Sequence, residues 1–106
     1  MRVLFDQGTP VPLRDSLPQH EVSTAFERGW SALKNGDLLD AAEREGFAVL
    51  VTTDTKLKFQ QNLTARRVAI VVLLTTSWPR IERASAEGAK AIGAATPGSY
   101  TEVSIP

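Results

Sequence analysis

Two aspartates, Asp6 and Asp54, each come directly after a run of β-forming residues. The run at 47–53 is almost wholly apolar and rich in branched side chains, which is typical of a strand buried on both faces of a parallel sheet. The run at 2–5 is shorter but similar in character. Ligands of open α/β sheets bind beyond the carboxyl ends of the strands, so two neighbouring strands would bring both carboxylates to one edge. Each aspartate taken singly also suits a cap of the turn that follows it.

Two carboxylates at one sheet edge predict a site for a divalent cation. Hard cations bind carboxylate oxygens, and Mg²⁺ keeps several waters while using only one or two protein carboxylates. A Mg²⁺ or Mn²⁺ ion held by Asp6 and Asp54 would activate water for attack on a phosphate. We therefore predict both aspartates as catalytic and metal-binding residues.

A third acidic group is predicted at the start of the helix that begins near residue 35. The N-terminus of this helix should face the same edge, and Asp37 in its first turn would point toward an ion beyond the helix end. We predict Asp37 as the third catalytic and metal-binding residue. The alternative is that Asp37 offsets the helix dipole, with Asn35 as an ordinary N-cap and Asp40 solvated one turn further in.

Substrate contacts are predicted around a basic segment that follows Asp54 and contains no acid. Its cations would contact phosphates, and Phe59 among them would stack a base. A hydroxyl next to Asp54 would hold a water or orient that carboxylate. The predicted substrate-binding residues are Thr53, Lys56, Lys58, Arg66 and Arg67. The alternative is a solvated loop with Leu57 and Phe59 turned inward, and Thr52 as a plain strand residue.

Strands and helices that would position these residues alternate along the chain. The predicted strands span 2–6, 20–24, 47–53, 68–74 and 100–105. The predicted helices span 10–17, 26–34 (irregular and broken at Gly29), 35–45 and 77–95, the last capped by Ser77 and weakened by Gly88 and Gly93. This order predicts one α/β domain over residues 1–106, with a small, mostly parallel sheet and helices on both faces. We expect the last strand to be antiparallel or poorly paired.

Composition excludes several kinds of site. The chain has no cysteine, which excludes disulfides and thiolate metal sites. Its single histidine, His20, starts a predicted strand, so we do not predict a catalytic role or a Ser-His-Asp arrangement for it. Net charge is zero, yet residues 1–54 hold nine acids and five bases, and residues 55–106 hold seven bases and three acids. An acidic centre beside a basic rim suits a metal-dependent enzyme acting on a phosphate chain.

Membrane and export signals are also missing from the pattern. The opening residues turn acidic too soon for a signal peptide, and the longest apolar run, 68–74, is far shorter than a membrane span. We expect a cytoplasmic protein that does not contact a membrane.

Three motifs together resemble the PIN-like domains, in particular the short bacterial kind related to VapC-type toxin ribonucleases and the Mut7-C domain. They are VLFD at 3–6, NGDLLDAA at 35–42, and VLVTTD at 49–54 followed by Lys56. The resemblance implies a three-layer α/β/α fold and Mg²⁺- or Mn²⁺-dependent hydrolysis of RNA phosphodiesters, with Asp6 and Asp54 as metal ligands. It also implies single-stranded RNA as a partner and, for a toxin of a toxin–antitoxin pair, an antitoxin protein and a homodimer.

The chain departs from that pattern at three places. Gln7-Gly8 follows the first aspartate where short relatives often have Glu-Asn, Asn35 stands where an acid is usual, and no acid occurs between residues 55 and 81. From these changes we expect an activity that is weak, depends on a single metal ion, or is lost. The alternatives are a non-catalytic PIN-like binding module and, less favoured, a phospho-accepting receiver domain, which would need an acid pair after its first strand.

Overall fold

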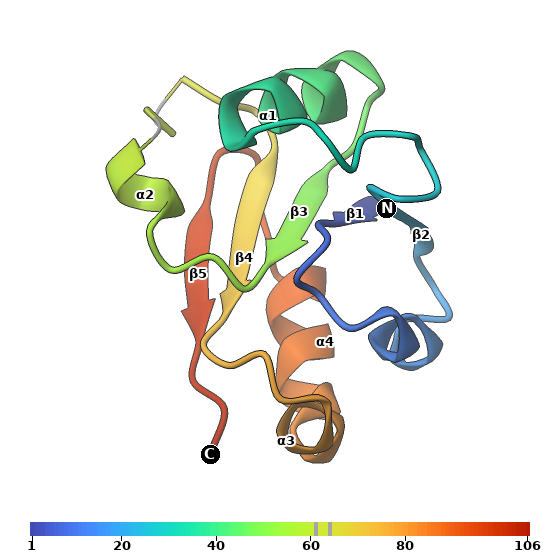
Figure 1. Ribbon diagram of the computed structural model, residues 1–106. Helices are drawn as coiled ribbons and strands as arrows, with labels where there is room; N and C mark the ends of the chain where they lie inside the picture. The colour runs from blue at the N-terminus through green and yellow to red at the C-terminus, as the bar shows by residue number, and fades with distance from the viewer. Residues whose placement is uncertain (61, 64) are drawn as a thin grey trace.

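The fold is an α/β sandwich built on a five-stranded sheet in which every strand pair is parallel (Figure 1). The computed structural model describes residues 1–60, 62, 63 and 65–106, and only the backbone of residues 59 and 60. The strand order is β2-β1-β3-β4-β5. The strands are β1 (Arg2–Phe5), β2 (Glu21–Thr24), β3 (Val49–Thr52), β4 (Ala69–Leu73) and β5 (Tyr100–Val103).

Helices cover both faces of the sheet, which confirms the predicted α/β class and its three layers. Residues alternate between the two faces along each strand, so Val49 and Val51 join one buried cluster and Leu50 joins the other. The first cluster lies under the 3₁₀ helix η1 (Val11–Ser16), α3 (Trp78–Arg83) and α4 (Ser85–Gly93). The second lies under α1 (Asn35–Arg44) and α2 (Leu57–Gln60). Figure 1 shows α4 and α1 on opposite sides of β3 and β4.

Helix α1 matters most for the site because it runs antiparallel to the strands. It buries Leu38, Leu39, Ala41 and Ala42 against the sheet. It ends before Gly46, whose φ of 78° is the left-handed conformation predicted for this C-terminus. The end of α1 meets the start of β1, where the Arg2 guanidinium donates to the carbonyl of Glu45. The start of α1 therefore lies at the carboxyl edge of the sheet.

The irregular helix predicted over 26–34 is wrong, because the chain forms turns there and no helix. Thr24 and Glu27 close a capping box: the Thr24 hydroxyl accepts the Glu27 amide at 3.0 Å, and the Glu27 carboxylate accepts the Thr24 amide at 2.9 Å. Two residues after Glu27, Gly29 takes a φ of 76°, and the amides of Gly29 and Trp30 bond back into the turn. The capping box starts a helical turn and Gly29 ends it within a few residues, so a longer helix cannot form there.

The single helix predicted over 77–95 is also wrong, because it is divided at Ala84 into α3 and α4. Ala84 leaves helical geometry at φ −107° and ψ 22°. The predicted start is confirmed, since α3 begins after Ser77, although the Ser77 side chain makes no capping bond. Ile81, Ala84 and Ile92 are all buried in one cluster, so both segments stay on the sheet.

The expectation that the last strand would be antiparallel or poorly paired is wrong. β5 pairs with β4 in parallel register, with Ile70 opposite Tyr100 and Leu73 opposite Val103. The segments α3 and α4 form the crossover that a parallel connection requires. In the described part of the chain, no helix is long and apolar enough to cross a membrane.

Candidate functional site

Asp6 and Asp54 stand at one edge of the sheet because their strands are neighbours. β1 and β3 pair in parallel with Phe5 opposite Val51, so the chain leaves both strands at the carboxyl edge. The side chain of Thr52 links the two aspartates. Its hydroxyl donates to Asp6 Oδ2 and accepts the backbone amide of Asp54 at 3.0 Å. Thr52, which the sequence suggested was a plain strand residue, is thus the bridge of the site.

The carboxylate of Asp6 is half-buried and held from several sides. Asp6 Oδ1 accepts the amide of Gly8 at 3.1 Å and lies 2.8 Å from the hydroxyl of Thr9. Burial raises the pKa of Asp6, although the hydrogen bonds from Thr52, Thr9 and Gly8 favour its ionised form. The Thr9 hydroxyl also lies 2.9 Å from the carbonyl of Val51. One hydroxyl proton serves two acceptors there, and a protonated Asp6 would satisfy both by donating to Thr9.

The carboxylate of Asp54 is fixed by one backbone and one side-chain donor. Asp54 Oδ1 accepts the amide of Lys56 at 2.8 Å, and Oδ2 accepts the side-chain amide of Asn35 at 2.9 Å. Because Asn35 opens α1, this bond ties the start of that helix to the end of β3. Asn35 is therefore part of the site, a role that the sequence analysis assigned to Asp37.

The structure does not bring Asp37 to the two aspartates. Asp37 is exposed, and no hydrogen bond or ion pair joins its side chain to another described residue. The reason is the phase of α1: Asn35 precedes the buried Leu38 and Ala42 by three and seven residues and shares their face, whereas Asp37 is turned away from it. Among the described residues, no three His, Cys, Asp or Glu side chains gather closely enough to hold a metal ion.

The loop after β1 closely approaches the loop after β3 at Gly8. A Cβ atom built on Gly8 would lie 2.6 Å from the hydroxyl oxygen of Thr53 and 3.7 Å from Asp6 Oδ1. Only glycine fits there without displacing Thr53. The Thr53 hydroxyl, a predicted substrate contact, thus lies beside Asp6, and the unusual glycine at position 8 has a steric reason.

The predicted basic segment is divided between the two edges of the sheet. Lys56 is exposed and directly follows Asp54 at the carboxyl edge. Lys58 also is exposed but is paired with β5: its ammonium lies 3.1 Å from the Glu102 carboxylate and 5.7 Å from the ring centre of Tyr100. The side chain of Phe59, predicted to stack a base, lies outside the described residues.

Arg66 and Arg67 precede β4 and so lie at the amino edge, away from Asp6 and Asp54. The Arg66 guanidinium binds two carboxylates of α1, Asp40 at 2.5 Å and Glu43 at 2.9 Å. Burial acts to raise the pKa of Glu43, but the bonds from Arg66 and from the Arg67 amide outweigh it and lower this pKa. Asp40, expected to be solvated only, is an ion-pair partner. These arginines join α1 to the sheet rather than extend the carboxyl-edge site.

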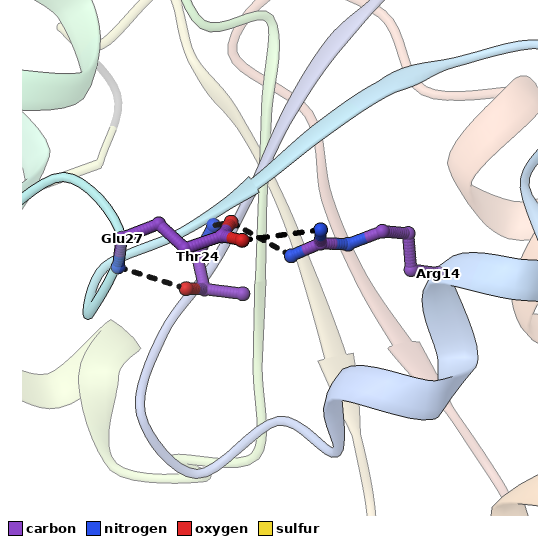
Figure 2. A network of polar contacts seen from close by, with 3 residues as sticks. All are labelled: Arg14, Thr24 and Glu27. Carbon is purple, nitrogen blue, oxygen red and sulfur yellow. Dashed lines mark hydrogen bonds and ion pairs between the residues drawn. The ribbon is translucent and has the colours of Figure 1, made fainter.

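Two hollows open on either side of Asp6. The larger, about 400 Å³, lies toward η1 and the turn after β2, and the smaller, about 150 Å³, lies toward Asn35. Figure 2 shows one wall of the larger hollow, where Arg14 from η1 meets Glu27, which is fixed in turn by Thr24. The Thr24-x-x-Glu27 capping pattern could have been found in the sequence, whereas the partner Arg14 carries no such signal.

Comparison of the chain with protein-family models, curated proteins and solved structures gave no match. The resemblance to PIN-like domains therefore remains a prediction from the residues quoted above.

Proposed function

We propose that this chain is a metal-dependent ribonuclease of the PIN-like kind, with Asp6 and Asp54 holding one Mg²⁺ or Mn²⁺ ion. The observation that carries the proposal is the bridge through Thr52, which joins the carboxylate of Asp6 to the backbone amide of Asp54 at the carboxyl ends of adjacent parallel strands. This is the usual place for a ligand site in an open α/β sheet. Two carboxylates are also as many as a Mg²⁺ ion commonly takes from a protein.

The carboxylate oxygens of Asp6 and Asp54 suit such an ion. Each carboxylate oxygen has two acceptor sites. Asp6 Oδ2 and both oxygens of Asp54 each accept a hydrogen bond from one side-chain or backbone donor. Acceptor capacity thus remains on both residues. When bound, the ion would act as a Lewis acid toward the phosphodiester and make water a stronger acid. The amide of Asn35 adds no charge, so we expect weak binding of a single ion.

The chain's own groups would orient and position the reactants. Thr52 fixes Asp6, while Asn35 and the Lys56 amide fix Asp54, so neither carboxylate must reorganise. The ammonium of Lys56 is exposed beside Asp54 and suits contact with a phosphate. Thr53 presents a hydroxyl between the two loops. We do not propose Arg66 for this role, because its ion pairs with Asp40 and Glu43 tie it to α1 at the amino edge.

The substrate we propose is single-stranded RNA, cut in the cytoplasm. The proposal extends to a toxin of a toxin–antitoxin pair, with an antitoxin protein as partner and a homodimer as the assembled form. This extension rests on the three PIN-like motifs alone.

A non-catalytic PIN-like binding module is the second candidate. It is favoured by the position of Asp37, because in the part of the chain that the structure describes no third acid joins Asp6 and Asp54 in a group that could hold a metal ion. Under this alternative Asp6 and Asp54 would serve to cap their loops, as the bonds to the Gly8 and Lys56 amides show they can.

Cleavage of RNA by matched variants distinguishes the two candidates. In Mg²⁺ or Mn²⁺, the wild type should cut mixed-sequence single-stranded RNA slowly, and EDTA should stop it. Asp54→Asn should abolish cutting, since it keeps the shape and removes the charge. Asp37→Asn is the control and should cut like the wild type. No cutting by the wild type, or equal loss in both variants, would favour the binding module or a site that includes Asp37.

A further inference from the structure

The larger hollow beside Asp6 lies between two segments that the proposed chemistry does not use. It is about 400 Å³ and is lined by residues of η1, of the turn after β2 and of the loop that begins at Asp6 and Gln7. Because Asp6 also belongs to the proposed metal site, a strand whose phosphate lies at Asp6 and Asp54 would place a neighbouring nucleotide at this hollow.

One wall is apolar and open to solvent. Phe26 is 78% exposed and Val11 is 51% exposed, and both line the hollow. A large aromatic ring left this exposed at a concave site is unusual for a residue that serves only the fold. Aromatic rings beside a nucleic-acid path are platforms on which bases stack.

The other wall is polar and rigid. The Arg14 guanidinium makes two bonds to the Glu27 carboxylate, at 2.7 and 3.2 Å, and Glu27 also accepts the Thr24 amide at 2.9 Å (Figure 2). The arginine fixes the carboxylate in position at the hollow. Glu27 and Asp6 both line the hollow with acceptor oxygens, which a ligand that donates hydrogen bonds would contact.

Gln7 adds an amide with one acceptor and two donors. It is exposed, and no hydrogen bond joins it to another described residue. A glutamine amide pairs in bidentate fashion with adenine, accepting from its amino group. Uracil carries no amino group and would turn carbonyl oxygens toward the carboxylates.

We infer that this hollow binds a base of the RNA strand next to the phosphate at Asp6, stacked on Phe26, and that it prefers a base with an exocyclic amino group, adenine above all. The inference rests on the proposed function, because that function places the strand at Asp6. It adds a specificity site to the proposed metal site.

The test is binding of fluorescently labelled octamers of adenylate, cytidylate and uridylate, measured by anisotropy in EDTA so that no metal-dependent cutting occurs. The wild type should bind the adenylate and cytidylate octamers more tightly than the uridylate octamer. Phe26→Ala should weaken binding of the adenylate octamer about 5- to 150-fold, the range for loss of one stacked base. Phe26→Trp should keep it, and Leu74→Ala, which removes an exposed apolar side chain outside the hollow, should leave it unchanged.

Unchanged affinity in Phe26→Ala would overturn the inference. The exposed side chains of Phe26 and Val11 would then be better explained as a contact surface for a protein. Tightest binding of uridylate, or no binding of any octamer, would overturn it as well. The RNA cleavage assay described above tests the proposed nuclease function separately from base binding. Cutting that does not depend on Phe26 refutes only the base site, and Phe26-dependent binding without cutting refutes only the nuclease.

Discussion

Replacing Gly8 by alanine tests the close approach of the loops that carry Asp6 and Thr53. Gly8 does not have a positive φ, so its backbone accepts alanine. The added methyl group would lie 2.6 Å from the Thr53 hydroxyl oxygen, well inside van der Waals contact, while its next neighbours, Asp6 Oδ1 at 3.7 Å and Thr53 Cβ at 3.9 Å, are at ordinary distances. The clash therefore involves a single atom.

The size and sign of the effect follow from that geometry. An added methyl group that forces its neighbours to shift costs about 1–3 kcal/mol, while Gly→Ala at a compatible position contributes about 0.4–1 kcal/mol by restricting the unfolded chain. Gly8→Ala should thus lower the free energy of unfolding by about 1 kcal/mol. In a Thr53→Ala protein the clashing oxygen is gone, and the same change should raise it by about 0.4–1 kcal/mol.

Urea unfolding of four proteins measures this coupling: the wild type, Gly8→Ala, Thr53→Ala and the double variant. The interaction energy should be about 1–3 kcal/mol, and the sign of the Gly8→Ala effect should reverse between backgrounds. Gly93→Ala is the control, because a methyl group there meets nothing within 4 Å. It should have the same effect with either residue at position 53. An equal effect of Gly8→Ala in both backgrounds would refute the placement of Thr53 over Gly8.

Three further predictions concern charges. Burial raises the pKa of Asp6 above 3.8, so its ionised form lowers the free energy of unfolding at neutral pH. Asp6→Asn should therefore be more stable than the wild type to urea at pH 7 in EDTA. This advantage should disappear as the pH is lowered toward 3.8, because the wild-type carboxyl then becomes protonated. Arg66→Ala removes both ion pairs to α1 and should cost about 1–2 kcal/mol in the same assay, with the rate of RNA cutting unchanged. Burial first, and then the hydrogen bond to Glu102, raise the pKa of Tyr100, the only tyrosine, to about 12. Absorbance at 295 nm should show little tyrosinate at pH 11 in the wild type and more in Glu102→Gln.

The sheet was predictable from the sequence because its central strands are apolar on both faces. Residues 49–52 and 69–73 are buried throughout, and such strands need helices on either side. The positions of Asp6 and Asp54 followed from the same logic, since each comes after such a run. The division of the predicted helix 77–95 at Ala84 could not be predicted from the sequence, because alanine is not a residue type that breaks helices.

The sequence pattern could not show whether Asn35 or Asp37 supplies the third side chain of the site. Asn35 and Asp37 are both in the first turn of α1, and only the phase of the helix against Leu38 and Ala42 decides which points inward. Thr52 became a bridge through the register of β1 on β3, which a lone sequence does not specify.

The cations of the basic segment lie at two different edges of the sheet because of the topology of the chain. Lys56 and Arg66 are ten positions apart, but the chain crosses from the carboxyl edge after β3 to the amino edge before β4 between them. Residues near in sequence across such a connection end on opposite edges of the sheet.

Binding of Mn²⁺ tests most directly the claim that Asp6 and Asp54 hold one divalent cation. Free Mn²⁺ gives a strong electron paramagnetic resonance signal that weakens on binding, so a titration counts sites without requiring activity. We predict one weak site per chain in the wild type and in Asp37→Asn, and its loss in Asp6→Asn and in Asp54→Asn, each folded by circular dichroism. Absence of a site in the wild type, or an undiminished site in Asp54→Asn, would contradict the account.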